Sequence, residues 1–314
     1  MDGKTPAEVE GKMSKVLSLH DAIARYVSDG SSVCLGAQME QMIPFSAAHE
    51  IIRQRRRDLT LIGPISDILF DQMIGAGCVR EVIAAWVGNV MMGSAYNFRR
   101  EVESGRVRAT NLTNFAVSLA LQAAALGVPF LPARTAMGSD VAKDNRFFNE
   151  IEDPFGSGMK LHAIKALAPD VTIAHVQRVD SDGNAHCWGN FGVMIEAVRA
   201  AKSVIVIAEE IVPAEMIASD PNRTVIPGFL VSAVVESPMG AHPSPVQGYY
   251  KRDDAFFRQY HEQSKMPEDF AEWAERWIYS RTDRSDYVQL LGQCRAESLS
   301  VKTHAYSAPA DFGY

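Results

Sequence analysis

Apolar and polar positions follow two different periods along the first two-thirds of the chain. Short apolar runs predict buried strands at residues 33–35, 59–62, 79–86, 107–111, 171–176, 203–208 and 231–236. Between these runs, apolar residues recur three or four positions apart, which predicts helices at residues 17–28, 44–54, 67–74, 95–104 and 113–126. The alternation indicates an α/β fold in which helices flank a largely parallel sheet.

The remainder of the chain has a different pattern. Residues 138–158 are rich in Gly, Asp and Asn and predict a loose stretch. Residues 181–184 read Ser-Asp-Gly-Asn, which predicts a tight turn because Asp-Gly accepts a positive φ. From residue 253 to about 291 the pattern is helical and carries spaced aromatic residues. These aromatic side chains pack either on the sheet or against a partner, and the first arrangement is favoured.

Length and composition bound the class of protein. We expect one domain over residues 15–297, with its helical C-terminal part at about 253–297 and tails at 1–14 and 298–314. A chain of 314 residues that is 47% apolar can bury a substantial core. The net charge of −7 argues against nucleic-acid binding, which needs a basic surface. No apolar run reaches the ~20 residues of a membrane span, so no membrane contact is expected.

Cysteine and histidine spacing gives no sign of a disulfide framework or a metal site. Cys34, Cys78, Cys187 and Cys294 lie far apart without a CxxC pair, as is typical of reduced thiols in a cytoplasmic protein. The N-terminal segment lacks the apolar stretch of a signal peptide. The histidines have no metal-ligand spacing, so we expect no metal.

The segment from Asp29 to Pro44 carries the first candidate chemistry. A turn leads into the short strand at 33–35, and Gly36-Ala37-Gln38 follows directly as a strand-to-helix loop. Open α/β sheets bind ligands at the carboxyl ends of their parallel strands. Small residues there let backbone N–H groups approach a substrate and stabilise a developing oxyanion. Taken alone, the stretch fits an ordinary strand-to-helix turn better than an oxyanion site.

The same stretch resembles the first signature of family I CoA-transferases. Asp29-Gly30, the apolar strand, Gly36 and Pro44 fit that signature, whereas Ala37, Gln38 and Met42 replace its second Gly, its Phe and its later Gly. Further similarity to the glutaconate CoA-transferase α subunit runs from about residue 14 to residue 291, at 126–132, 137–139, 152–155, 182–189, 209–211, 226–228 and 240–244. The resemblance implies the CoA-transferase (NagB/RpiA-like) fold with a helical C-terminal extension.

The resemblance also implies a reaction and a partner. In this family a glutamate of the β subunit, within a Ser-Glu-Asn-Gly motif, attacks an acyl-CoA and becomes an enzyme–CoA thioester. An acceptor carboxylic acid then takes the coenzyme A. This chain has no Ser-Glu-Asn-Gly motif, as expected of an α subunit that lines one wall of an interface site. The implied assembly is α2β2 or higher, without a metal cofactor.

Site residues are implied at the positions that match the family. The backbone of Gly36, Ala37 and Gln38 would form the oxyanion loop. Loops 39–43 and 87–93 would line the acyl pocket, and their methionines favour a larger, more apolar acyl group unless these side chains only fill core. His242 either faces the site or holds a loop by hydrogen bonds. The substrate-binding candidates are Met42, Gly88, Asn89, Val90, Met91, Asn114, Gly138, Ser139 and His242.

Two other functions stay open at this stage. One is a CoA-ester hydrolase on the same fold, in which water replaces the acceptor acid. A steroid-degrading hydrolase branch places a catalytic glutamate where this chain has Asn114, and an asparagine cannot act as a general base. The other is a non-catalytic binding or regulatory role for this chain, which the altered Gly36-Ala37-Gln38 loop permits.

Overall fold

The central feature of the fold is one mixed sheet. The computed structural model describes residues 14–301, so the predicted tails at 1–14 and 298–314 lie largely outside the described residues. Within this range nine strands form the main sheet. They are β1 (Ser32–Cys34), β2 (Leu59–Ile62), β3 (Val79–Ala84), β4 (Arg108–Asn111), β8 (Val171–Val179), β9 (Ala185–His186), β10 (Ser203–Ile211), β11 (Thr224–Ile226) and β12 (Ala233–Glu236).

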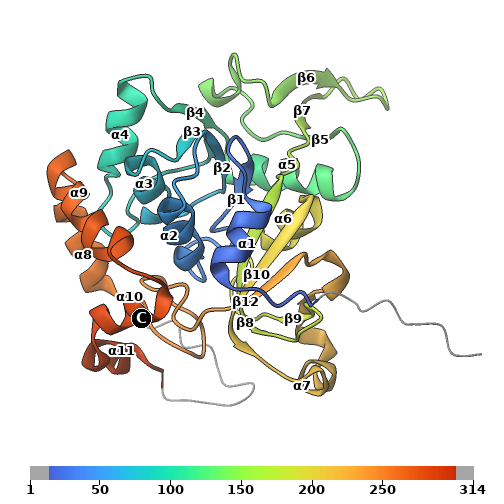
Figure 1. Ribbon diagram of the computed structural model, residues 1–314. Helices are drawn as coiled ribbons and strands as arrows, with labels where there is room; N and C mark the ends of the chain where they lie inside the picture. Colours follow the sequence, from blue (N-terminus) through green and yellow to red (C-terminus); the bar gives the residue numbers. More distant parts are fainter. Residues whose placement is uncertain (1–13, 302–314) are drawn as a thin grey trace, which may run out of the picture.

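Most of the sheet is parallel, as the sequence predicts. Strands pair in the order β12-β10-β8-β1-β2-β3-β4, and every pair in this row is parallel. The short strands β9 and β11 add an antiparallel extension at the end of β8. Since the parallel strands share a direction, their carboxyl ends meet at one edge, where the connecting loops converge (Figure 1).

Helices cover both faces of the sheet, and strand residues alternate between the two sides. On β10, Ile205 and Ile207 pack in one hydrophobic cluster, whereas Val204 and Val206 pack in the other. The first side is covered by α1 (Leu19–Tyr26), α2 (Phe45–Arg53), α3 (Ile68–Gly75), α4 (Tyr96–Glu103), α8 (Asp254–Gln263), α9 (Pro267–Ala274) and α10 (Arg284–Leu291). The second side is covered by α5 (Asn114–Ala125) and α6 (Met194–Ala200).

The helical C-terminal region belongs to the core, as predicted. Phe256, Trp273, Trp277 and Tyr287 are each at most 3% exposed and belong to the same cluster as α2 and α3. The Phe256 ring meets the Trp277 ring edge-on at a centroid distance of 4.9 Å. The shorter elements around this framework are α7 (Ala214–Ser219), α11 (Gln293–Leu299), η1 (Asp140–Ala142), η2 (Pro221–Arg223), η3 (Gly228–Leu230) and the π-helical turn η4 (Glu275–Tyr279).

A second, small sheet corrects one prediction. The stretch 138–158, expected to be loose, contains β6 (Phe148–Glu152), which pairs with β7 (Lys160–Lys165), and β7 pairs with β5 (Phe130–Ala133). The prediction was wrong because β6 reads Phe-Asn-Glu-Ile-Glu and is mostly exposed, so no apolar run marks it. The turn at 181–184 is confirmed: it joins β8 to β9 in an antiparallel hairpin, and Gly183 has a φ of 93°.

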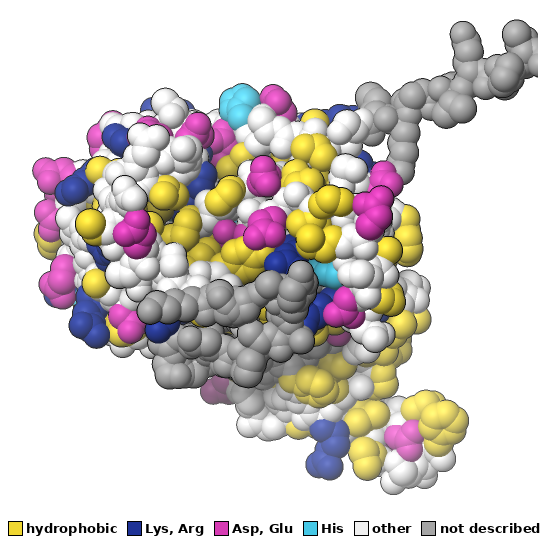
Figure 2. Space-filling view, turned by 90° about the horizontal axis from the view of Figure 1, so that it is seen from below, with side chains coloured by type: hydrophobic (Ala, Val, Ile, Leu, Met, Phe, Trp, Pro, Cys, Tyr) yellow, Lys and Arg dark blue, Asp and Glu magenta, His cyan; other side chains and the backbone are white. Residues whose placement is uncertain are grey.

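The charged side chains on the surface are of both signs (Figure 2). On the face seen in Figure 2, acidic and basic side chains are mixed, with apolar groups between them. The side chains that are coloured on that face form no concentrated positive patch (Figure 2). Among residues 14–301, no helix has both the length and the apolar character required to cross a bilayer.

Candidate active site

The loop after β1 leaves the strand through a backbone conformation that suits glycine. Gly36 has a φ of 65°, and a Cβ at this position would lie 2.7 Å from Ser66 Oγ. Ser66 donates its hydroxyl hydrogen to the carbonyl oxygen of Leu35 at 3.0 Å. This hydrogen bond joins the loops that follow β1 and β2, at the point where a side chain on residue 36 would collide with Ser66.

Several backbone N–H groups of this loop, including those of Ala37 and Gln38, lack a hydrogen-bond acceptor among residues 14–301. The carbonyl of Ala37 accepts from the N–H of Val193 at 2.8 Å, which fixes the loop against the start of α6. Within the part of the chain that the structure describes, no acceptor takes the N–H of Ala37 or of Gln38. Both residues are nearly buried, at 4% and 2% exposure, and buried N–H groups without partners are rare. The geometry suits the predicted oxyanion loop, whose catalytic role stays a prediction.

The Gln38 side chain points into the protein. Its amide donates to Cys187 Sγ at 3.4 Å and to Met42 Sδ at 3.6 Å. Burial raises the pKa of the Cys187 thiol to about 12, so this sulfur stays protonated. Met42 is fully buried in a hydrophobic core cluster. Of the loop residues predicted to bind substrate, Met42 thus occupies a core position.

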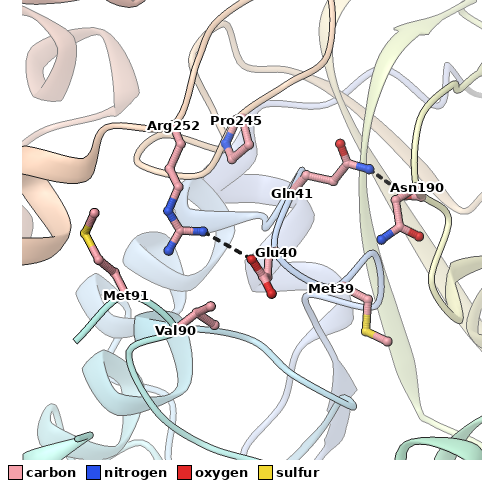
Figure 3. Close-up of a pocket in the computed structure, with 8 residues that line it drawn as sticks. All are labelled: Met39, Glu40, Gln41, Val90, Met91, Asn190, Pro245 and Arg252. Carbon is pink, nitrogen blue, oxygen red and sulfur yellow. Dashed lines mark hydrogen bonds and ion pairs between the residues drawn. The ribbon is translucent and has the colours of Figure 1, made fainter. Parts of the chain in front are cut away.

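A pocket of about 330 Å³ lies next to this loop. It is built where the loops after β1, β3, β9 and β12 converge at the carboxyl edge of the sheet (Figure 3). The two loops predicted to form an acyl pocket, 39–43 and 87–93, therefore meet here. The lining residues are Met39, Glu40, Gln41, Val90, Met91, Asn190, Pro245 and Arg252.

Within the loop after β3, two residues hold the backbone and two face the pocket. Asn89 is 1% exposed, and its amide nitrogen donates to the carbonyl of Phe257 at 3.0 Å. Its side-chain oxygen accepts the N–H groups of Met91 and Met92, each at 3.1 Å. Gly88 lies against the indole of Trp86, where a Cβ would overlap the ring. Val90 and Met91 are the members of this loop that line the pocket.

Arg252 is the cation of the pocket. Its Nη2 contacts Asp67 Oδ2 at 2.8 Å, and its guanidinium lies 4.0 Å from the centroid of the Phe257 ring. Its Nε lies 3.4 Å from Asp254 and its Nη1 lies 3.7 Å from Glu40. Burial raises the pKa of Asp67 to about 6, although Arg252 and the N–H of Val90 act against this shift.

Sequence reasoning named Val90 and Met91 individually and missed the other six lining residues. They are Met39, Glu40, Gln41, Asn190, Pro245 and Arg252. Glu40 and Gln41 fall inside the predicted loop 39–43, so that loop already held the signal. Asn190 and Arg252 come from distant segments, and no spacing in the sequence brings them to the pocket.

His242 holds a loop and does not face the pocket. It is fully buried; its Nε2 lies 2.9 Å from Asp253 Oδ2 and its Nδ1 lies 2.8 Å from the Tyr287 hydroxyl. Burial lowers the pKa of His242 to about 4, so the ring is neutral near pH 7. Burial alone would raise the pKa of Asp253, but hydrogen bonds from His242 and Arg295 bring it below its ordinary range. Of the two roles left open for His242, the contacts match loop support.

The sequence model of one known protein family matches this chain. The coenzyme A transferase model covers residues 16–237, which is more than half of the 314 residues. The chain belongs to the coenzyme A transferase family. The loop after β1 lies within the matched region, as do all the lining residues of the pocket except Pro245 and Arg252.

Two CoA-transferase subunits and one hydrolase subunit are similar to this chain over most of their length. The A-type subunit of the 3-oxoadipate CoA-transferase of Pseudomonas knackmussii is 37% identical, with 90% of this chain and 99% of the relative covered. The A-type subunit of the glutaconate CoA-transferase of Acidaminococcus fermentans is 35% identical, with 92% and 95% covered. The crystal structure of glutaconate coenzyme A-transferase from that organism matches at a TM-score of 0.87, over 92% of this chain and 96% of that chain. The cholesterol ring-cleaving hydrolase IpdA subunit of Rhodococcus jostii is 28% identical, with 87% and 94% covered.

The remaining candidate residues lie away from the pocket of this CoA-transferase chain. Asn114 is the exposed first residue of α5. Gly138 and Ser139 are exposed before η1, where Ser139 Oγ accepts the N–H of Val141 at 3.2 Å. None of the three lines the pocket of about 330 Å³, and their role in substrate binding stays a prediction. Among residues 14–301, no three His, Cys, Asp or Glu side chains are grouped as metal ligands.

Proposed function

We propose that this chain is the α subunit of a heteromeric CoA-transferase that moves coenzyme A between an acyl-CoA and a carboxylic acid. The observation that carries the proposal is the pocket at the carboxyl edge of the sheet, formed by the same two loops that the family resemblance assigns to the acyl group. End-to-end similarity to the A-type subunits of two CoA-transferases supports it.

The proposed reaction proceeds through the partner's glutamate. That carboxylate attacks the thioester carbonyl, the carbon–sulfur bond breaks, and CoA departs as a thiolate, which leaves an acyl–glutamyl anhydride. The thiolate then attacks the glutamyl carbonyl and releases the donor acid, which leaves a glutamyl–CoA thioester. The acceptor carboxylate repeats the two steps in reverse order and departs as the new acyl-CoA.

This chain supplies binding and electrostatic stabilisation in that scheme. Each step passes through a tetrahedral intermediate that carries an oxyanion, and N–H groups held in place stabilise such a charge without reorganising. The unpaired N–H groups of Ala37 and Gln38 suit this role. The pocket beside Met39 and Met91 suits the acyl group.

The proposed partner is a β subunit with a Ser-Glu-Asn-Gly motif, in an α2β2 or larger assembly. The relatives are named as A-type subunits, which supports a second kind of chain. An α2β2 complex is the simplest closed symmetric form. We also propose a cytoplasmic location, supported by the free thiols of Cys34, Cys78 and Cys187 in the core.

The experiment that tests the proposal follows the fate of coenzyme A. The chain is co-expressed with a β-type partner, and the complex receives short- and medium-chain acyl-CoA donors with increasing concentrations of an acceptor acid. For a transferase, new acyl-CoA forms at a rate that rises with acceptor, and free CoA stays low. Release of free CoA at a rate independent of acceptor would make the complex a hydrolase. An intact complex that turns over no donor would assign this chain to a binding or regulatory role.

One observation supports the hydrolase alternative, and another argues against it. The similarity to the ring-cleaving hydrolase subunit shows that hydrolytic chemistry occurs on related chains. The position that we align with the catalytic glutamate of that branch is Asn114, which cannot take a proton as a general base. Transfer is therefore the function that we propose.

A further inference from the structure

We infer that the pocket takes acyl groups that carry no charge at the end remote from the thioester, so that the substrates are monocarboxylic acids. The inference rests on the proposed function, since it names the substrate class of that same pocket. Glutaconic and 3-oxoadipic acids, after which two relatives are named, carry a carboxylate at each end. The inferred specificity therefore departs from the acids named in those relatives.

The cation of the pocket, Arg252, already contacts acidic side chains. Arg252 is the only Lys or Arg among the residues that line the pocket within the described range. A guanidinium binds a carboxylate best through two parallel N–H groups, as a fork. Each nitrogen of Arg252 already faces an acid, since Nη2 meets Asp67 and Nε meets Asp254. Its Nη1 faces Glu40, an arrangement that Figure 3 shows from the side of the pocket.

The charged side chains around Arg252 have a negative sum. Three carboxylates lie within 4 Å of the guanidinium nitrogens, so this group of four side chains carries a net negative charge when all three carboxylates are ionised. Asp67 is fully buried, so water does not screen its charge. A distal carboxylate on the acyl group would bring a further negative charge into this group. Like charges at such distances disfavour each other's ionised forms, so the pocket repels a dicarboxylic acyl chain.

Four apolar side chains also line the pocket. Val90 and Met91 line the pocket beside Glu40 and Arg252, and Met39 and Pro245 complete its apolar lining (Figure 3). Methionine side chains adapt to apolar ligands of irregular shape. Each methylene that the acyl chain buries against this wall strengthens binding by about fourfold. An uncharged chain gains this contact without bringing a carboxylate near Asp67.

The test uses two thioesters that differ only in the distal carboxylate. Valeryl-CoA and glutaryl-CoA have acyl chains of equal carbon number, and glutaryl-CoA adds the second carboxylate. The complex of this chain with its β-type partner is titrated with each thioester by calorimetry, and CoA transfer from each is measured in parallel. We expect valeryl-CoA to bind at least about tenfold more tightly, and to be the better donor, because the pocket excludes the added charge.

A charge-removing variant tests whether Glu40 contributes. Glu40 is 53% exposed at the pocket, so Glu40→Gln removes one negative charge and releases Arg252 Nη1 without opening the core. The affinity ratio of glutaryl-CoA to valeryl-CoA is expected to rise about fivefold. Glu103→Gln is the matched control: this glutamate on α4 is 70% exposed, pairs with Arg99 and lies outside the pocket lining. The control variant is expected to leave the ratio at its original value.

The possible outcomes distinguish failure of this inference from failure of the proposed function. Tighter or equal binding of glutaryl-CoA, or failure of both thioesters to bind, overturns the inference. An unchanged ratio in Glu40→Gln also overturns it, because the carboxylates would then not set the preference. Preferential binding of valeryl-CoA without any CoA transfer would support the charge preference while contradicting the transferase function.

Discussion

Gly36 and Gly30 stand at opposite ends of β1 and have similar backbone conformations, with φ values of 65° and 80°. Their surroundings differ, because a Cβ at Gly36 would lie 2.7 Å from Ser66 Oγ, whereas a Cβ at Gly30 meets nothing within 4 Å. A comparison of the two positions therefore separates backbone strain from the packing of the loop after β1.

We predict that Gly36→Ala lowers kcat/KM for CoA transfer by at least about tenfold, since it displaces the N–H groups of Ala37 and Gln38. Gly30→Ala carries only the strain of a positive φ, about 1–2 kcal/mol of unfolding free energy, and should retain kcat/KM. Steady-state kinetics and urea unfolding of both variants provide the measurement. Equal kinetic losses in the two variants would contradict a catalytic loop at residue 36.

His242 makes the stability of the protein depend on pH. Its pKa is about 4 in the folded chain and near 6.5 in the unfolded chain, so the unfolded state binds more protons between these values. The contribution of the neutral ring is therefore fully present above about pH 6.5 and is lost as the pH falls toward 4. The pKa difference corresponds to about 3 kcal/mol.

We predict that the free energy of unfolding depends on pH differently in wild type and in His242→Asn. Asp67 has a raised pKa, and its own contribution to stability changes in the opposite direction over an overlapping range, from its ordinary value to about 6. Comparing the two proteins removes the Asp67 contribution. The free energy of unfolding, measured in urea at pH 5 and pH 7.5, should increase with pH more steeply in wild type than in the variant. Identical slopes would show that His242 does not titrate as its burial requires.

At the scale of elements, the loop after β3 depends on one side chain. Asn89 links its own loop to the carbonyl of Phe257 in α8 and accepts two N–H groups from Met91 and Met92. We predict that Asn89→Ala raises KM more than it lowers kcat, because Val90 and Met91 lose their fixed positions along the pocket. The lost buried hydrogen bonds should destabilise the chain by about 1–3 kcal/mol.

The control for this prediction is Asn149→Ala, since Asn149 is exposed on β6 in the small sheet. Its replacement should change the free energy of unfolding by less than about 0.5 kcal/mol and leave KM unaltered. Substrate titration and urea unfolding of both variants measure the effects. A KM in Asn89→Ala equal to that of the control would argue that the loop does not shape the pocket.

Elements with a strong period could be predicted from the sequence, and weakly patterned ones could not. The strand at 33–35 and the helix at 44–54 were confirmed to within a residue or so as β1 and α2, because their apolar faces are buried. The strand β6 was missed because it is mostly exposed, and β7 was missed because its three buried residues, 162–164, do not form a long apolar run. Hydrophobic periodicity detects burial against a core, so it gives no signal for an exposed strand such as β6, which pairs with β7 through its backbone.

The lining of the pocket could be predicted to the level of its loops, and substrate binding there stays a prediction. Loops 39–43 and 87–93 were expected to meet, and Met39, Val90 and Met91 do line one pocket. Which residues of a loop turn inward depends on local hydrogen bonds, so Met42 and Asn89, chosen for the pocket, are buried instead. The charge of the pocket depends on Arg252 and Asp67, which are far apart in the sequence and meet through the tertiary fold.

At the scale of the whole molecule, we propose that this chain supplies one wall of a site that its partner completes. The pocket, the unpaired N–H groups and the converging loops lie together at one edge of the sheet. The family to which the chain belongs includes A-type subunits that match it over nearly their full length. The account therefore places binding and oxyanion stabilisation on this chain and the nucleophile on its partner.

Intact-mass spectrometry of both subunits, after incubation of the complex with an acyl-CoA and no acceptor acid, tests this division most directly. The account predicts a coenzyme A adduct on the partner, abolished by hydroxylamine, and no adduct on this chain. Glu40→Gln should leave the partner's adduct in place, since Glu40 contacts Arg252 and is not the proposed nucleophile. An adduct on this chain, or CoA transfer by this chain without a partner, would contradict the account.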